Sequence, residues 1–193
     1  NNTRNTVTGE FGLYITGKTR AYIRGEYAEL EYPAGLLNDA DIVSGVLGLE
    51  GFIISNKLRY DVNGGVMNWD SQPTGISGDD NDYDGGIGWG TIVYRPLEES
   101  ALTFQLDGGR KLDWSAISNY RIDDSILFTV RDEFMPKRLA WDLSAKYSTH
   151  EQSEGPRWTR LELGAGLEYT PHGQVLVSLR YLYRTQDSDE DYE

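Results

Sequence analysis

Apolar side chains occupy every second position in ten segments of this chain, most of them about 9–13 residues long. Successive residues of a β-strand point to opposite faces of a sheet, so the pattern predicts strands with one apolar and one polar face. The clearest segments are residues 139–148, 158–169 and 175–184, and the others are residues 7–15, 20–32, 43–50, 58–66, 83–95, 101–112 and 118–134. The chain is therefore predicted to be all-β.

The connections between these segments alternate in length. Short turns are expected at residues 17–19, 55–56, 96–100, 135–138 and 170–173, and longer polar segments at residues 33–40, 70–82, 113–117 and 151–157. Outer-membrane barrels have short turns on the periplasmic side and longer loops outside. A soluble β-sandwich has no reason to alternate its loops so regularly. The pattern therefore favours antiparallel strands in meander order, each joined to the next by a hairpin.

Composition excludes a helical membrane protein. Hydrophobic residues make up 38% of the sequence, and the mean hydropathy is -0.54. No apolar run approaches the roughly 20 residues that a spanning helix needs. A membrane barrel is compatible with these values, because only alternate residues of its strands meet lipid. Segments of about ten residues also match a tilted strand that crosses the hydrocarbon, and they exceed the usual strand length in globular proteins.

Aromatic residues, 12% of the chain, gather near the ends of the expected strands. Trp and Tyr prefer the two interfaces of a membrane, where barrels carry aromatic girdles. The residues expected in such girdles are Tyr32, Trp69, Tyr94, Trp141, Tyr147, Trp158, Tyr169, Tyr181 and Tyr183. These features predict an antiparallel up-and-down transmembrane β-barrel in a bacterial outer membrane. The alternative is a soluble or surface β-sandwich that binds glycans.

The C-terminal part of the chain carries a set of short motifs. Residues 161–184 read LELGAGLEYTPHGQVLVSLRYLYR and are followed by TQDSDEDYE. A Tyr-x-Pro turn lies at Tyr169–Pro171, a Tyr-x-Tyr-Arg strand at Tyr181–Arg184, and an acidic segment at Ser188–Tyr192. This segment resembles a C-terminal hairpin of the outer-membrane β-barrel porins associated with exopolysaccharide and capsule export in Gram-negative bacteria.

The resemblance implies a pore or conduit in the outer membrane, in contact with lipid and lipopolysaccharide and serving exopolysaccharide export. Barrels of that family have more than ten strands and end in a final strand with a terminal aromatic residue. Residues 1–193 are therefore expected to form a single barrel domain that lacks its last strand and further strands at the N-terminus.

Charge and residue types narrow the chemistry. The formal net charge of -13 argues against nucleic acid as a partner, since phosphates need a basic surface. There are no cysteines, which excludes disulfides and thiolate chemistry. The histidines at His150 and His172 stand alone in the sequence, and no serine lies in a Gly-x-Ser-x-Gly elbow. We expect no enzymatic activity.

The polar face of the expected strands carries charges of both signs. The candidate lumen-lining residues are Arg59, Asp61, Asp142, Lys146, Arg160, Glu162, Glu168, Arg180 and Arg184. They fit either a salt-bridged ladder that holds the barrel in shape or the lining of a polar conduit, because charges in an interior must pair or stay hydrated. A polysaccharide path would add aromatic platforms, for which Tyr14 and Tyr94 are the inward candidates.

Acidic loops are the only feature that points to a cofactor. Asp80, Asp82 and Asp84, followed by Gly85, have the spacing that opens a calcium-binding EF-hand loop, but Thr91 replaces the acid expected at its twelfth position. Calcium at these carboxylates, bridging to lipopolysaccharide phosphates, is one interpretation. A solvated acidic loop is the other. No further cofactor is expected.

Overall fold

A computed structural model of the chain describes residues 3–31, 38–54, 57–72, 82–97, 101–114, 119–135, 138–172 and 175–188. All regular structure in these residues is β-strand. The strands are β1 (Thr3–Thr16), β2 (Thr19–Glu31), β3 (Asp39–Ile53), β4 (Leu58–Gln72), β5 (Tyr83–Tyr94), β6 (Thr103–Trp114), β7 (Tyr120–Met135), β8 (Leu139–Gln152), β9 (Trp158–His172) and β10 (Val175–Ser188). No helix in the described part of the chain is long and apolar enough to cross a bilayer.

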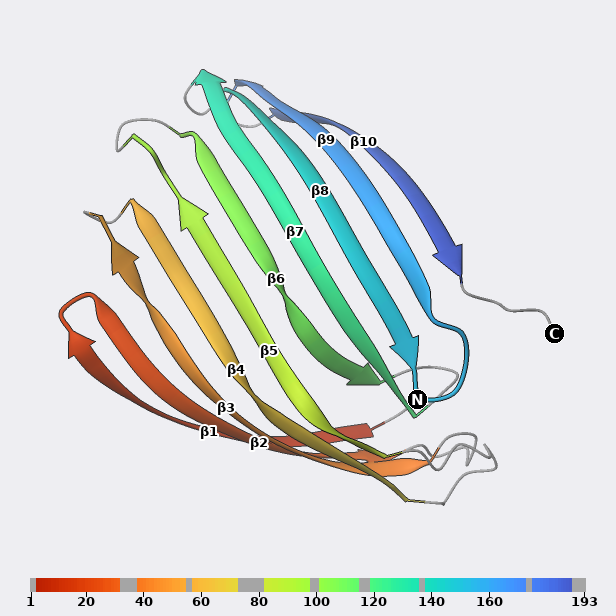
Figure 1. Ribbon diagram of the computed structural model, residues 1–193. Coiled ribbons are helices and arrows are strands. Elements are labelled where there is room, and N and C mark those ends of the chain that lie inside the picture. The colour runs from red at the N-terminus through yellow and green to blue at the C-terminus, as the bar shows by residue number, and fades with distance from the viewer. Residues whose placement is uncertain are drawn as a thin grey trace.

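The strands form one ten-stranded sheet in sequence order, and every neighbouring pair is antiparallel. Figure 1 shows the ribbons side by side from β1 in red to β10 in blue, curved into an open shell. The predicted meander is therefore confirmed. The described residues contain no second sheet, so the alternative prediction of a β-sandwich is wrong.

The expectation of a barrel is met only in part, because the sheet does not close. The strand order begins at β1 and ends at β10, so each of these strands has a neighbour on one side only. Closure into a barrel requires the strand tilt, the stagger and the number of strands to match. These ten strands curve without bringing β1 to β10, and they form an open wall.

Several strands are longer than their sequence pattern indicated, because residues expected in turns extend the hairpins. Residues 170–172 were predicted as part of a turn, yet β9 continues to His172, which pairs with Val175. In the same way β4 runs on to Gln72, into the segment expected as a long loop. Turn residues that keep an extended backbone add further hydrogen-bonded pairs to the two strands that they connect.

The register aligns apolar side chains into rows on one face, here called the outer face. Phe11 on β1 lies opposite Ile23, and Ile23 lies opposite Leu47 on β3. All three side chains are exposed. At the other end of the sheet the residues expected to face outward are also exposed, namely Leu161, Leu163, Leu167, Val175, Val177 and Leu179. The opposite face, here called the inner wall, is concave and carries most of the charged side chains of the strands.

Two glycines allow neighbouring strands to approach closely where the sheet curves. Gly109 has a φ of +151°, and a Cβ at this position would collide with the carbonyl oxygen of Gly88. A Cβ at Gly65 would collide with the carbonyl oxygen of Gly45. Only glycine tolerates both demands at position 109. The two positions thus permit a curvature that larger residues would oppose.

Gly109 also marks a break in the alternation of β6. Leu106 lies on the outer face, opposite Ile92 and Phe128, and is exposed. Leu112, six residues further on, should share that face, but it packs against buried side chains on the concave side. Those buried side chains form the apolar cluster of the sheet, which comprises Ala28, Leu30, Ala40, Ile42, Trp69 and Tyr120.

We expect Gly109→Ala to lower the free energy of unfolding by about 1–3 kcal/mol, because the added methyl group meets backbone atoms at a φ that L-residues avoid. Gly45→Ala is the matched control, since a Cβ there meets nothing within 4 Å. Urea unfolding followed by tryptophan fluorescence gives both values. Equal stability of the two variants would show that close packing at Gly109 does not limit the curvature.

Candidate functional site

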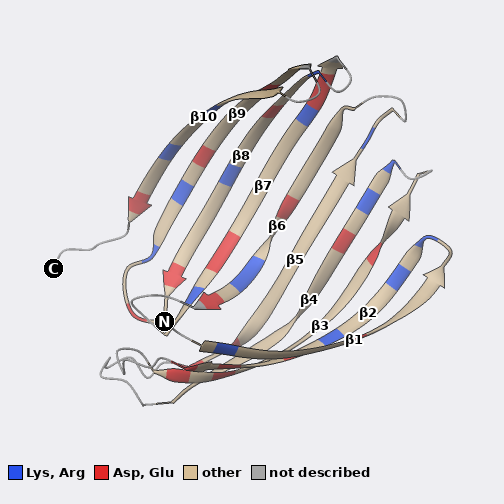
Figure 2. Cartoon of the chain, turned by 180° about the vertical axis from the view of Figure 1, so that it is seen from behind, with Lys and Arg blue, Asp and Glu red and all other residues tan. Residues whose placement is uncertain are grey.

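The inner wall is the candidate functional surface, because it gathers polar side chains from strands far apart in the sequence. Figure 2 shows acidic and basic residues interspersed along β8, β9 and β10, rather than segregated by sign. The same face of β1, β2 and β4 carries further charges. How these charges are paired determines the net charge of this surface.

At the β1 edge of the wall, Glu10 binds two arginines. Arg20 donates to Glu10 over 2.5 Å and also to Glu50 on β3 over 2.9 Å. Arg24 donates to the second oxygen of Glu10 through both Nε and Nη2, at 2.9 and 2.6 Å. The guanidinium groups of Arg20 and Arg24 lie 5.7 and 5.3 Å from the ring centre of Tyr22, a cation–π arrangement. This network crosses β1, β2 and β3 and neutralises most of its own charge.

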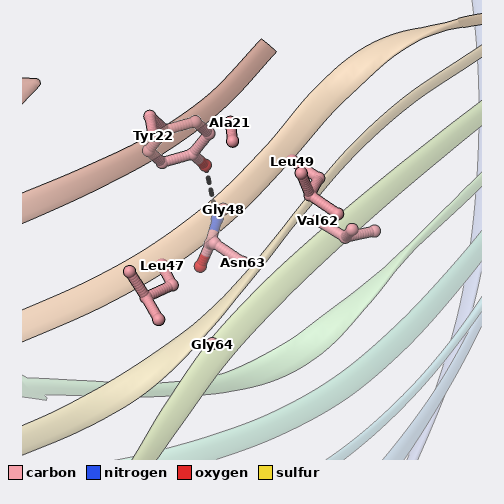
Figure 3. Close-up of a pocket in the computed structure, with 8 residues that line it drawn as sticks. All are labelled: Ala21, Tyr22, Leu47, Gly48, Leu49, Val62, Asn63 and Gly64. Carbon is pink, nitrogen blue, oxygen red and sulfur yellow. Dashed lines mark hydrogen bonds between the residues drawn. The ribbon is translucent and has the colours of Figure 1, made fainter. Parts of the chain in front are cut away.

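A second network joins β2, β4 and β5. The hydroxyl of Tyr22 donates to Asp61 over 3.1 Å and accepts from Asn63 Nδ2 over 3.3 Å. Figure 3 shows the Tyr22 and Asn63 side chains meeting beside Gly48. Any Cβ at Gly48 would overlap the Tyr22 ring. Asn63 Oδ1 accepts from the backbone N–H of Trp89 over 3.2 Å. The predicted lumen residue Asp61 is therefore part of a hydrogen-bonded network that joins β2, β4 and β5.

In the C-terminal half of the wall, the predicted cross-strand pairing is confirmed at one site. Glu162 and Arg184 are register partners, and Arg184 Nε lies 2.5 Å from the Glu162 carboxylate. Glu168 pairs instead with Arg131 on β7, at 2.9 Å. Arg160 donates to the neutral Gln186 over 2.8 Å. Arg180 lies opposite Gly166, not opposite an acid.

The remaining predicted lumen residues are less closely paired. Asp142 and Lys146 lie on the inner face of β8, where their register partners on β9 are Gly166 and Glu162. No ion pair links Arg59, Asp142, Lys146 or Arg180 to another of the described residues. Tyr94, an expected inward platform, is on the outer face, where it stacks on Phe104 at 6.3 Å. That expectation was wrong because it assigned Tyr94 to the wrong one of the two alternating faces of β5.

A cavity of about 450 Å³ opens on the inner wall between β2 and β6. Its polar lining includes Arg24, Glu26, Asp61 and Lys111, while Met67, Ile87 and Leu112 form an apolar border. The Lys111 ammonium lies 3.7 Å from the ring centre of Trp89, which also lines the cavity. Sequence inspection missed Trp89 and Lys111, since nothing in their spacing indicates that β5 and β6 bring them together.

His150, expected to stand alone, has two polar partners and a stacking partner. Its Nδ1 lies 2.6 Å from Asp123 Oδ1, and its Nε2 lies 3.0 Å from Ser148 Oγ. Arg121 binds the same carboxylate through two contacts of 2.7 Å. The imidazole stacks on Trp158 with ring centres 5.2 Å apart. The partners of His150 could not be found from its isolated place in the sequence, because Asp123 reaches it from a different strand.

An Asp–His–Ser chain of this geometry is the arrangement that activates serine nucleophiles. A nucleophile must also touch the carbonyl carbon that it attacks. Ser148 is only 1% exposed, and the neighbouring Arg160 Nε is buried as well. Ser148 is therefore enclosed by the described residues around it and is not exposed for such an attack. The chain of hydrogen bonds ties β7 to β8 with His150, while Trp158 covers the ring from β9.

The acidic segment proposed for calcium is partly outside the described residues, since Asp80 is not among them. Asp82 Oδ1 accepts from the backbone N–H of Ser71 over 2.8 Å, which gives this carboxylate a structural partner. Within the described ranges no group of three His, Cys, Asp or Glu side chains could hold a metal ion. Calcium at Asp80, Asp82 and Asp84 remains a prediction.

No protein-family model, no curated protein and no solved structure matches this chain.

Asp123→Asn should lower the free energy of unfolding by about 1–3 kcal/mol, because the neutral amide weakens its bonds to both Arg121 and His150. Asp142→Asn is a suitable control on the same wall, with an expected change within about 0.5 kcal/mol, since Asp142 has no ion pair among the described residues. Urea titration of both variants measures the difference. A loss at Asp142 as large as that at Asp123 would contradict a structural role for the His150 contacts.

Proposed function

We propose that this sheet is part of the wall of a bacterial outer-membrane β-barrel and that the barrel acts as a pore or conduit. One observation carries the proposal: a band of exposed apolar side chains runs along the outer face from β1 to β10, and nothing among the described residues covers it. The same face becomes acidic near one end of β2, β3 and β4, at Glu29, Asp41 and Asp70. Phe11 at one end is 63% exposed, and Leu179 at the other is 70% exposed. A soluble monomer rarely exposes an apolar patch of more than a few hundred Å². Lipid hydrocarbon would cover this face.

The strand edges support the same environment. β1 and β10 each leave a row of backbone N–H and C=O groups without a neighbouring strand in the described structure. Such edges are not tolerated in hydrocarbon, where every backbone polar group needs a partner. We propose that further antiparallel strands pair with β1 and β10 and close the barrel.

The outer surface also has features that fit lipid. Phe134 stacks on Trp141 at 6.0 Å, near the short turn between β7 and β8. Tyr147, Tyr169, Tyr181 and Tyr183 are exposed on the outer face, as an aromatic girdle requires. A groove of about 500 Å³, whose apolar lining includes Leu47, Leu49 and Val62, has the character of a site for acyl chains (Figure 3). Trp69 and Trp158 do not join the girdle, since they contact inner-wall residues.

The inner wall supports a conduit for a solute of low charge. Glu10, Glu162 and Glu168 are all bound by arginines, which leaves a surface that is polar but largely neutralised. A neutral or weakly charged hydrophilic chain, such as an exopolysaccharide, would meet hydrogen-bonding groups without a strong electrostatic trap. Lipopolysaccharide would border the outer face.

Leu163→Arg should lower the stability of the protein in lipid vesicles by about 2–4 kcal/mol, because an outward-facing charge would enter hydrocarbon at mid-strand. Leu182→Arg is the matched control: Leu182 lies on the adjacent strand but on the inner wall, opposite Gly164. Reversible urea unfolding from vesicles measures both. If the two substitutions cost the same, the outer face does not meet lipid.

Arg180→Glu should shift the ion selectivity of the pore toward cations, because Arg180 has no acid opposite it and its charge is open to the lumen. Reversal potentials across planar bilayers under a salt gradient measure the change. Arg184→Gln provides a comparison at a residue whose charge Glu162 already neutralises. A pore with unaltered selectivity in Arg180→Glu would remove Arg180 from the lining.

A further inference from the structure

The apolar cluster lies on the concave side of the sheet, at the end where the long connections emerge. It takes Ala28 and Leu30 from β2, Ala40 and Ile42 from β3, and Trp69 from β4, and these side chains are at most 2% exposed. Tyr120, at the start of β7, is 9% exposed and completes the cluster. The lining of a water-filled space is expected to be polar along its whole length, whereas this end of the inner wall is apolar and buried.

The cluster joins strands that are not neighbours in the sheet. Two strands, β5 and β6, separate β4 from β7. Even so, the rings of Trp69 and Tyr120 lie 6.0 Å apart, and those of Tyr83 and Tyr120 lie 5.7 Å apart. Ile122 from β7 and Leu112 from β6 pack against the same group. The contact therefore bridges the concave side instead of following it.

Hydrogen bonds hold Tyr120 in this position. Its hydroxyl donates to the carbonyl oxygen of Asp82 over 3.1 Å, and its own carbonyl oxygen accepts from the N–H of Ser153 over 3.0 Å. The Trp69 indole N–H is buried and has no hydrogen-bond partner among the described residues.

The polar cavity of the inner wall ends at this cluster. Met67 and Leu112 line the cavity and also pack against the buried residues. Away from the cluster, the cavity is lined by the charged residues Arg24, Asp61 and Lys111. A solute that follows the polar wall toward the long connections thus meets an apolar surface directly after the charged one.

We propose that the apolar cluster is a hydrophobic constriction that closes the inner side of the wall at its long-loop end. The inference rests on the proposed function, since it assigns a closed state to that same conduit. Apolar constrictions exclude water and ions by dewetting, without a physical plug. Passage of a hydrophilic solute requires the start of β7 to move away from β4, which separates Tyr120 from Trp69.

Single cysteines test the constriction directly, because the chain has none of its own. Ala28→Cys places a small thiol in the cluster, at a side chain that is 0% exposed. Ser44→Cys is the matched control on the next strand, on the wall of the polar cavity. With a water-soluble maleimide we expect Ala28→Cys to react at least about tenfold more slowly than Ser44→Cys, since thiol reactivity follows exposure.

Adding Trp69→Ala or Tyr120→Ala to Ala28→Cys should bring its labelling rate close to that of Ser44→Cys and raise the conductance in bilayers. Tyr120→Phe keeps the ring and should leave labelling slow. Equal labelling of Ala28→Cys and Ser44→Cys in the otherwise unaltered chain would overturn the constriction. So would conductance that does not respond to Trp69→Ala. Quenching of tryptophan fluorescence by brominated lipids reports insertion separately, and its absence would overturn the proposed function.

Discussion

Hydrogen bonding between neighbouring strands is the constraint on which the rest of this structure depends, because it sets the register. A shift of one residue in any pair would exchange the two faces of that strand. With the observed register, Phe11, Ile23 and Leu47 share the outer face, while Glu10, Arg24 and Val46 share the inner wall. Every side chain that bears on function takes its direction from these pairings.

The two faces solve different physical problems. The outer face presents leucines, valines and tyrosines. Removing water from these side chains stabilises the protein. The inner wall presents charges that would be costly in a dry interior unless they are paired. Arginine supplies the donors in several of these pairs, as at Glu10 and Glu162. Its fork of donors can bind two oxygens at once, and Arg20 uses it to bind both Glu10 and Glu50. The wall is thereby polar and yet close to neutral where the pairs form.

Curvature then converts a polar wall into a space with distinct regions. Neighbouring strands approach closely at Gly65 and Gly109, and in the curved sheet Tyr120 at the start of β7 contacts Trp69 near the end of β4. One region of the concave side becomes a cavity lined by Asp61 and Lys111. Another becomes the apolar cluster. Side chains on the concave side thus line a polar cavity in one region and form a buried apolar cluster in another.

Alternation along the chain was enough to predict the strands, their antiparallel order and the outward direction of residues such as Leu163 and Leu179, because the period of two is a local property of the backbone. It also placed Glu162 and Arg184 within reach of each other across a short hairpin. Contacts between distant strands lay beyond it: Asp123 with His150, Lys111 with Trp89 and Tyr120 with Trp69. These depend on register and on curvature summed over several strands, and a φ at one glycine can redirect the residues that follow. Whether the wall closes was likewise decided only by the tertiary structure, since closure depends on tilt and stagger accumulated over the whole sheet.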